Sequence, residues 1–274
     1  MKTNYHTHTT WCDGKDTPRK VIQAAVAKGF EAIGFSSHAM LPLEKAEWGM
    51  DADVLPRYAR EVRRLADEFK DQILVLCGVE ADYVPGRSNP DRATYAAIAP
   101  NYIIGSVHFV VAPDGALVPV DCSPEDLQAG IRDHFGGDAE RYVRAYFAQV
   151  REMVTNYDFD VVGHLDLVRK FNVKNPYFDE KSDWYREEIG KTAAAVAKSG
   201  KIAEVNTGAI ARGWLDDAYP SEEFRRMLRE KGVKFILSSD AHTANGIDCA
   251  FDRFEKAEEY VDFRISSSCL SSPV

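Results

Sequence analysis

The stretch Tyr5-His6-Thr7-His8-Thr9 lies near the N-terminus and contains two histidines separated by one residue. Side chains alternate between the two faces of a β-strand, so His6 and His8 are expected on the same face. Two neighbouring imidazoles fill an apolar core poorly, whereas imidazole is a common metal ligand. The pair therefore predicts two ligands of a metal site at the end of a strand.

The same residue types recur at the ends of other predicted strands. Five more apolar segments run into a histidine or an acidic residue: 35–38 (FSSH), 77–80 (CGVE), 105–108 (GSVH), 162–166 (VGHLD) and 237–242 (LSSDAH). Six of the seven histidines thus lie at or just after a predicted strand end, and only His134 does not. Scattered histidines would not give this pattern, which predicts a site for several metal ions.

Seven predicted strands alternate with predicted helices along the chain. The strands are expected at 4–8, 32–36, 73–79, 102–107, 160–163, 202–205 and 233–238, and the last helix at 247–261. No GxGxxG motif follows the first strand, which argues against a dinucleotide-binding open sheet. The alternation favours a (β/α) barrel, in which the active site lies at the C-terminal ends of the strands.

The length of 274 residues is compatible with one barrel domain, which we expect to span residues 1–264. A hairpin around 113–115 and a short helix after Ser123 are expected to interrupt the alternation. The Ser-rich tail at 265–274 has no periodicity and is expected to be poorly ordered.

The composition indicates the cellular compartment and excludes some classes of partner. The net charge of −9 argues against nucleic acid as the main partner, since such proteins usually carry a basic surface. The five cysteines form no CxxC motif, which is typical of a reduced cytoplasmic protein. No signal peptide and no apolar stretch long enough to span a membrane is visible, so we expect no membrane partner.

The predicted ligands suit metal-assisted hydrolysis. Zn, Mn and Fe all accept imidazole and carboxylate ligands, and Glu80 and Asp240 are candidates to bridge two ions about 3.5–4 Å apart. A hydroxide held between two such ions is a nucleophile at neutral pH, because the metal lowers the pKa of water to about 7. Arg169 and Arg212, each a few residues past a strand end, are candidates to bind phosphoryl oxygens.

The ordered motifs HTHT, SSH, GVE, SVH, GHLD and SDAH resemble those of the polymerase and histidinol phosphatase (PHP) superfamily. The stretches at 163–171 (GHLDLVRKF) and 206–213 (NTGAIARG), followed by YPS at 219–221, resemble its histidinol-phosphatase branch. The resemblance extends from residue 2 to about residue 260. It implies an α/β fold, a distorted TIM-like (β/α)7 barrel, with three divalent metal ions.

The resemblance also implies roles for individual residues. It assigns His6, His8, Glu80 and Asp240 to one ion. A second ion takes Glu80, His108 and His164, and a third takes Asp13, His38 and His242. Arg169 and Arg212 fall where the branch is expected to bind phosphate. Asp240, His242 and Arg212 are the expected catalytic residues, although the general acid stays open between a metal-bound water, Asp240 and His242. Asp166 is expected to orient His164 or a neighbouring residue.

The leading hypothesis is a phosphomonoesterase that hydrolyses L-histidinol phosphate to L-histidinol and phosphate in histidine biosynthesis. One alternative is a phosphoesterase of the same superfamily that acts on nucleotides or other small phosphate esters. A barrel amidohydrolase is a further alternative, but such enzymes usually bridge their ions with a lysine, and none lies at the Glu80 position. The last alternative is a metal-binding protein without catalysis.

Overall fold

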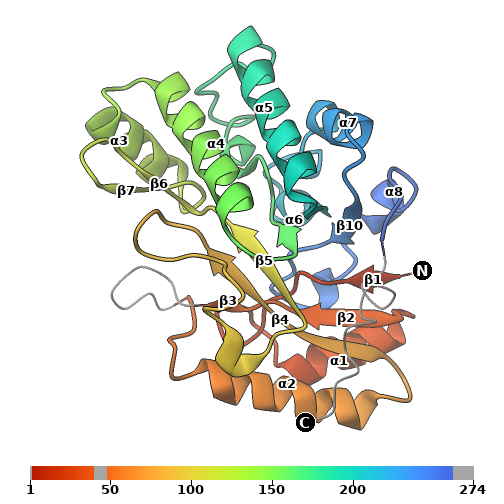
Figure 1. Cartoon of the computed structure of the whole chain (residues 1–274). Helices are drawn as coiled ribbons and strands as arrows, with labels where there is room; N and C mark the ends of the chain where they lie inside the picture. Colours follow the sequence, from red (N-terminus) through yellow and green to blue (C-terminus); the bar gives the residue numbers. More distant parts are fainter. Residues whose placement is uncertain (1, 40–47, 262–274) are drawn as a thin grey trace.

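The computed structural model describes residues 2–39 and 48–261 (Figure 1). Seven strands lie side by side in chain order, and every neighbouring pair is parallel. They are β1 (Thr3–Asn4), β2 (Ala32–Phe35), β4 (Leu74–Asp82), β5 (Tyr102–Ser106), β8 (Val161–Val162), β9 (Ile202–Asn206) and β10 (Phe235–Ser238). A two-residue strand, β3 (His38–Ala39), also pairs with β4.

The sheet curves into a nearly closed barrel because the segments that follow β1 and β10 meet. The His8 amide donates a hydrogen bond to the Ala241 carbonyl at 2.8 Å, and the Ala241 amide donates to the His6 carbonyl at 3.3 Å. Thr7 and Ala241 thereby form a parallel bridge. The first and last predicted ligand segments are neighbours at this seam, which confirms the predicted distorted (β/α)7 barrel.

The barrel interior contains a packed apolar core, formed by Tyr5, Ala32, Leu76, Tyr102, Ile104, Val161 and Ile236. Tyr102 fills it, and its hydroxyl donates a 2.5 Å hydrogen bond to the Tyr5 carbonyl. Gly34 and Gly78 make room for this ring, because a Cβ at either position would lie within 2.4 Å of a Tyr102 side-chain atom. Barrel interiors are filled by side chains in this way, so the polar site is confined to one end.

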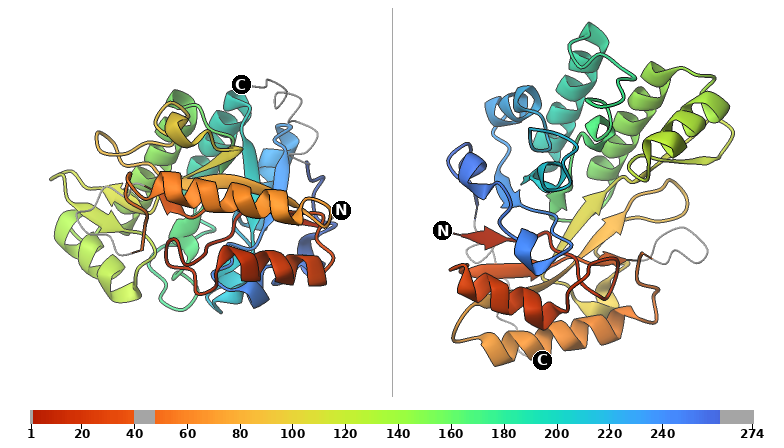
Figure 2. Two further views of the ribbon diagram at one scale, coloured as in Figure 1. Left: turned by 90° about the horizontal axis from the view of Figure 1, so that it is seen from below. Right: turned by 180° about the vertical axis from the view of Figure 1, so that it is seen from behind.

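Helices cover the outside of the barrel. Figures 1 and 2 show α1 (Pro18–Ala27) and α2 (Leu55–Phe69) on one side of the sheet, and α4 (Ala139–Asn156) and α5 (Asp183–Ser199) on the opposite side. In α2 the buried residues lie along one face, as in an amphipathic helix: Leu55, Tyr58, Ala59, Val62, Leu65 and Phe69. The outer shell also includes α7 (Glu222–Glu230).

Short elements complete the described chain. The predicted hairpin is present as β6 (Phe109–Val111) and β7 (Leu117–Pro119), and the predicted helix after Ser123 is α3 (Pro124–His134). The remaining turns are η1 (Ala96–Ile98), η2 (Leu167–Arg169), α6 (Gly208–Ala211), η3 (Ala244–Gly246) and α8 (Phe251–Phe254). Among the described residues, no helix has both the length and the apolar character that crossing a bilayer needs.

The long helix predicted at 247–261 is wrong. Only the four residues of α8 are helical in this segment, and Ala250 just before them adopts a left-handed backbone with φ of +57°. The chain then returns to the barrel, where the Val261 amide donates to the Phe235 carbonyl at 2.8 Å. The predicted domain end at 264 and the tail at 265–274 lie outside the described residues.

Candidate metal centre

The structure brings all nine predicted ligands together at the C-terminal ends of the strands. Three groups have potential ligand atoms within 4.8 Å of one another: His6, His8 and Glu80; His38, Glu80 and His108; and His8, Asp13, His38 and His242. His164 and Asp240 join them through the contacts described below. Residues more than 200 positions apart in the chain therefore share one site.

Glu80 lies at the centre of this arrangement and is almost fully buried. Its Oε2 atom lies 3.1 Å from His6 Nε2, 3.4 Å from His8 Nε2 and 3.0 Å from His38 Nδ1. Its Oε1 atom lies 3.0 Å from His164 Nε2 and 3.5 Å from His108 Nε2. Each carboxylate oxygen thus faces a different set of imidazoles, as a carboxylate that bridges two ions requires.

Asp240 lies on the other side of the seam and faces two of these imidazoles, those of His6 and His8. Its Oδ1 atom lies 3.2 Å from His8 Nε2 and 3.8 Å from His6 Nε2. The residue has a φ of +50°, a left-handed conformation that aspartate tolerates better than most residues. This turn brings the carboxylate into the site directly after β10.

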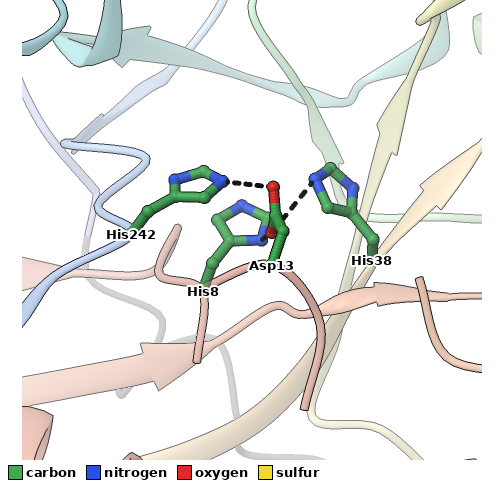
Figure 3. A group of neighbouring side chains, drawn as sticks. All are labelled: His8, Asp13, His38 and His242. Atoms are coloured by element: carbon green, nitrogen blue, oxygen red, sulfur yellow. Dashed lines mark hydrogen bonds and ion pairs between the residues drawn. The ribbon is translucent and has the colours of Figure 1, made fainter. Parts of the chain in front are cut away.

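A more exposed group surrounds Asp13, in the loop that follows the HTHT stretch (Figure 3). Asp13 Oδ2 lies 3.0 Å from His242 Nε2, and Oδ1 lies 3.8 Å from His8 Nδ1 and 4.0 Å from His38 Nε2. The side chain of Asp13 is 35% exposed, whereas that of Glu80 is 1% exposed. Asp13 is therefore close enough to complete a site with three imidazoles at the surface of the centre.

Several buried polar atoms of the centre make no hydrogen bond, and this supports a metal site. They are His6 Nε2, His8 Nε2, Glu80 Oε2 and His164 Nδ1. A buried polar atom without a hydrogen bond costs about 1–3 kcal/mol. Divalent ions would bind several of these atoms, and imidazole and carboxylate are ligands that Zn, Mn and Fe accept. The donor set therefore fits divalent ions.

Some groups of the centre are already in the form that binds metal. Burial, together with His242 and His38, lowers the pKa of His8 to about 3, so its ring is neutral at pH 7. Although burial acts to raise the pKa of Glu80, the surrounding histidines hold it well below its usual value. A neutral imidazole and an ionised carboxylate are the forms that bind metal.

His6 and His108 are not in the form that binds metal. Although burial acts to lower their pKa values, Glu204 raises that of His6 and Asp82 raises that of His108 to about 10, so a metal ion would displace a proton from each ring.

Two buried carboxylates support the histidines from behind, and sequence reasoning missed both. Glu204 accepts a hydrogen bond from His6 Nδ1 at 2.9 Å and another from the His164 amide at 2.6 Å. Asp82 Oδ1 lies 2.5 Å from His108 Nδ1. Asp166, the residue expected to orient His164 or a neighbour, instead accepts from the Ser221 amide at 2.8 Å. Glu204 thus takes the position near His164 that we expected for Asp166.

A cavity of about 280 Å³ opens onto the centre. Besides predicted ligands it is lined by Trp48, Asp121, Cys122, Leu167, Lys170, Arg212 and Tyr219. Arg212 Nη1 donates to Asp240 Oδ2 at 3.3 Å, and Nη2 lies 3.1 Å from His242 Nδ1. Arg212 therefore lies on the cavity wall beside two candidate ligands, and phosphate binding by Arg212 stays a prediction.

Arg169 is placed differently. Its side chain is 8% exposed, its Nε donates to Glu180 at 2.6 Å, and its Nη1 lies 3.5 Å from Asp166. It does not belong to the cavity lining, whereas the next residue, Lys170, does. Phosphate binding by Arg169 stays a prediction that this geometry does not favour.

Comparison with known proteins gives a consistent result. The PHP domain model matches residues 4–208. A probable histidinol-phosphatase of Deinococcus radiodurans is 30% identical over 253 residues, which cover 90% of this chain and 88% of that protein. The histidinol-phosphatase of Bacillus subtilis is 26% identical over 267 residues, which cover 93% of this chain and 98% of that protein.

Solved structures share the fold. A candidate histidinol phosphatase from Listeria monocytogenes superposes with a TM-score of 0.80 at 21% identity, covering 92% of this chain and all of that chain. A histidinol phosphate phosphatase from Lactococcus lactis, solved with zinc, L-histidinol and phosphate, gives a TM-score of 0.61 at 23% identity, with 93% of both chains covered. The chain belongs to the PHP domain family, in the branch of the histidinol-phosphatases.

Proposed function

We propose that the protein is a metal-dependent phosphatase that hydrolyses L-histidinol phosphate to L-histidinol and phosphate. The observation that carries this proposal is the convergence of nine candidate ligand side chains at one end of the barrel, where seven of them line the same cavity as Arg212. The names of the relatives from D. radiodurans and B. subtilis support the substrate. The zinc, L-histidinol and phosphate in the L. lactis structure support both the metal and the products.

We assign the candidate ligands to three divalent ions in the arrangement that the family resemblance implies. Inner site one takes His6, His8, Glu80 and Asp240, inner site two takes Glu80, His108 and His164, and the outer site takes Asp13, His38 and His242. The geometric groups differ in detail, because His38 also approaches Glu80 and His8 also approaches Asp13. Bound divalent ions would neutralise phosphoryl oxygens and activate the attacking water.

Arg212 is the residue that we assign to the phosphoryl group. Its guanidinium is one-third exposed and lies beside Asp240 and His242, at the edge of the proposed ion sites. A guanidinium offers paired N–H donors that match two oxygens of one phosphate. It also keeps Asp240 ionised: although burial acts to raise the pKa of Asp240, Arg212 and His6 hold it well below its usual value.

Asp121 is the residue that we assign to the amine of the substrate. L-Histidinol phosphate carries an ammonium group as well as a phosphate, so its pocket needs an anionic group away from the phosphate site. Burial acts to raise the pKa of Asp121, but Lys170 and His108 lower it to about 2, so this carboxylate is ionised at pH 7. Lys170 Nζ holds it by donating to Asp121 Oδ2 at 3.0 Å and to the Asp121 carbonyl at 2.8 Å.

The test is phosphate release by metal-loaded protein from a panel of esters. We expect kcat/KM for L-histidinol phosphate to exceed that for p-nitrophenyl phosphate and for nucleoside monophosphates by at least about 100-fold. Glu80→Gln should abolish release from every ester, because Glu80 faces both inner sites. Equal rates on all esters would contradict the assigned substrate, and faster nucleotide hydrolysis would favour the alternative phosphoesterase.

A further inference from the structure

We infer that the three proposed ions are held unequally: the outer-site ion exchanges readily, whereas the two inner ions are retained through Glu204 and Asp82. This inference rests on the proposed three-ion centre. It concerns residues of this chain outside the ligand set, and it predicts an order in which metal leaves the protein.

Glu204 supports inner site one. The carboxylate and the His6 ring are both completely buried, and Glu204 Oε2 lies 2.9 Å from His6 Nδ1. A proton on Nδ1 is therefore shared with the carboxylate, which leaves the Nε2 lone pair directed at Glu80 and Asp240. A carboxylate behind a ligating imidazole fixes its tautomer and raises its basicity, and losing such a partner typically costs 10–100-fold in metal affinity.

Glu204 also reaches the second inner site through the main chain. Its other oxygen, Oε1, accepts from the His164 amide at 2.6 Å and from the Asn206 side chain at 2.9 Å. One buried carboxylate therefore fixes the ring of His6 and the backbone position of His164. These two histidines belong to different proposed sites.

Asp82 gives inner site two the same kind of support. Asp82 follows Glu80 by two residues in β4, so both carboxylates lie on the same face of the strand. Asp82 Oδ1 lies 2.5 Å from His108 Nδ1, while His108 Nε2 faces Glu80 Oε1. Both side chains are nearly buried, so water competes little for this hydrogen bond.

In the described part of the chain, the support behind the outer-site histidines is not independent of the inner sites. His38 Nδ1 lies 3.0 Å from Glu80 Oε2, but Glu80 is itself assigned to the two inner ions. The Nδ1 atom of His242 lies 3.0 Å from the Asp240 carbonyl and 3.1 Å from Arg212 Nη2. Arginine can only donate, so Arg212 favours the His242 tautomer with its proton on Nε2, which competes with the tautomer that leaves Nε2 free to bind a metal. The positive charge of Arg212 also disfavours a cation at this position.

The outer site is also more accessible to solvent than the two inner sites. The side chains of Asp13 and His242 are 35% and 22% exposed, whereas those of His6, Glu80, His164 and His108 are between 0% and 7% exposed. Water and chelators can therefore reach the outer site more easily. Ligand support and access both predict that this ion leaves first.

The experiment is a chelator titration of the zinc-loaded full chain, with retained zinc counted by elemental analysis after desalting. We expect one ion per chain to leave at a chelator concentration at least tenfold below that which removes the other two. Asp13→Ala should eliminate this first step and leave the second unchanged. Glu204→Gln and Asp82→Asn should each shift the second step about 10–100-fold toward lower chelator, and the first step should stay in place.

Release of all three ions in a single step would overturn the inference, as would a first step that persists in Asp13→Ala. Unchanged inner retention in both Glu204→Gln and Asp82→Asn would also overturn it. Thermal unfolding of the loaded variants checks the fold; if Glu204→Gln does not fold, Asp82→Asn and Asp13→Ala decide. A wild-type protein that binds no zinc would instead contradict the proposed metal centre, so the two failures are distinguishable.

Discussion

The segments after β8 and β9 begin alike and end differently. Each leaves the barrel at its C-terminal end and reaches an arginine within a few residues, at Arg169 and Arg212. Arg169 turns away from the cavity into ion pairs with Glu180 and Asp166. Arg212 lies on the cavity wall beside Asp240 and His242. An arginine at a similar position after a strand can thus either stabilise the fold or line the cavity. The turn that follows the strand determines where its side chain lies.

Close packing explains how Arg212 reaches the centre. It caps the C-terminal end of α6, which begins at Gly208. A Cβ at Gly208 would lie 2.5 Å from Arg212 Nη1 and 3.0 Å from Asp240 Oδ2. Glycine therefore leaves the space that the guanidinium occupies, and the segment containing Arg169 has no equivalent device.

Among the variants that compare the two arginine segments, the largest expected effect on activity comes from removing the guanidinium on the cavity wall. Arg212→Ala should lower kcat/KM for L-histidinol phosphate by roughly 10³-fold, because a charge-stabilising donor beside the reacting group is lost. Steady-state phosphate release measures this effect. Arg212→Lys should recover only part of the loss, since lysine lacks the paired donors. An alanine variant with wild-type kcat/KM would erase the proposed difference between the two arginines.

Gly208→Ala tests whether packing positions Arg212. The added methyl group should displace the guanidinium and lower kcat/KM by about 10–100-fold, with all ligands intact. Gly190→Ala is the matched control, because a Cβ at Gly190 meets no atom within 4 Å. Equal activity of the two variants in the same assay would show that Arg212 does not depend on Gly208.

Lys170→Met removes the cavity cation that follows Arg169. We expect kcat/KM to fall about tenfold, since Lys170 holds Asp121 through hydrogen bonds to a charged group. The change should appear mainly in KM for L-histidinol phosphate and little in KM for an ester without an amine. Lys174→Met, a neighbouring exposed lysine, is the control and should leave both KM values unchanged.

Arg169→Met should have the smallest effect on activity and a clear effect on stability. It leaves Asp166 and Glu180 without their buried cation, which is expected to cost about 3 kcal/mol in the free energy of unfolding. Urea denaturation measures this loss, and kcat/KM per folded molecule should change less than about twofold. A large loss of kcat with normal stability would contradict this expectation and support phosphate binding by Arg169.

The barrel and the convergence of its candidate ligands could be predicted because both depend on one rule of topology. The carboxyl ends of parallel strands meet at one end of a barrel, so polar residues after each strand must converge. His6, Glu80 and Asp240 follow this rule despite their separation in sequence. Arg169 does not, because the turn after a short strand decides where a side chain points, and strand position carries no such information.

The supporting residues left weaker signals in the sequence. Asp82 shares a strand face with Glu80, and Glu204 is an acidic residue between the apolar Ala203 and Val205. Both acidic residues are visible in the sequence, but the sequence alone does not show which histidines they contact. The helix at 247–261 failed for the opposite reason: Phe251 and Phe254 are buried with helical spacing, but the chain turns back to β10 soon after them.

The seam at Thr7 and Ala241 gives the metal a mechanical role as well as a chemical one. Inner site one would tie His6 and His8, near the start of the chain, to Asp240, near the end of the described residues. An ion at that position acts as a reversible cross-link that closes almost the whole polypeptide into one loop, and long loops gain most from such a link. Loading with metal should therefore slow amide hydrogen exchange at His8 and Ala241 more than in the outer helices. Metal binding would then stabilise the closed form of the barrel.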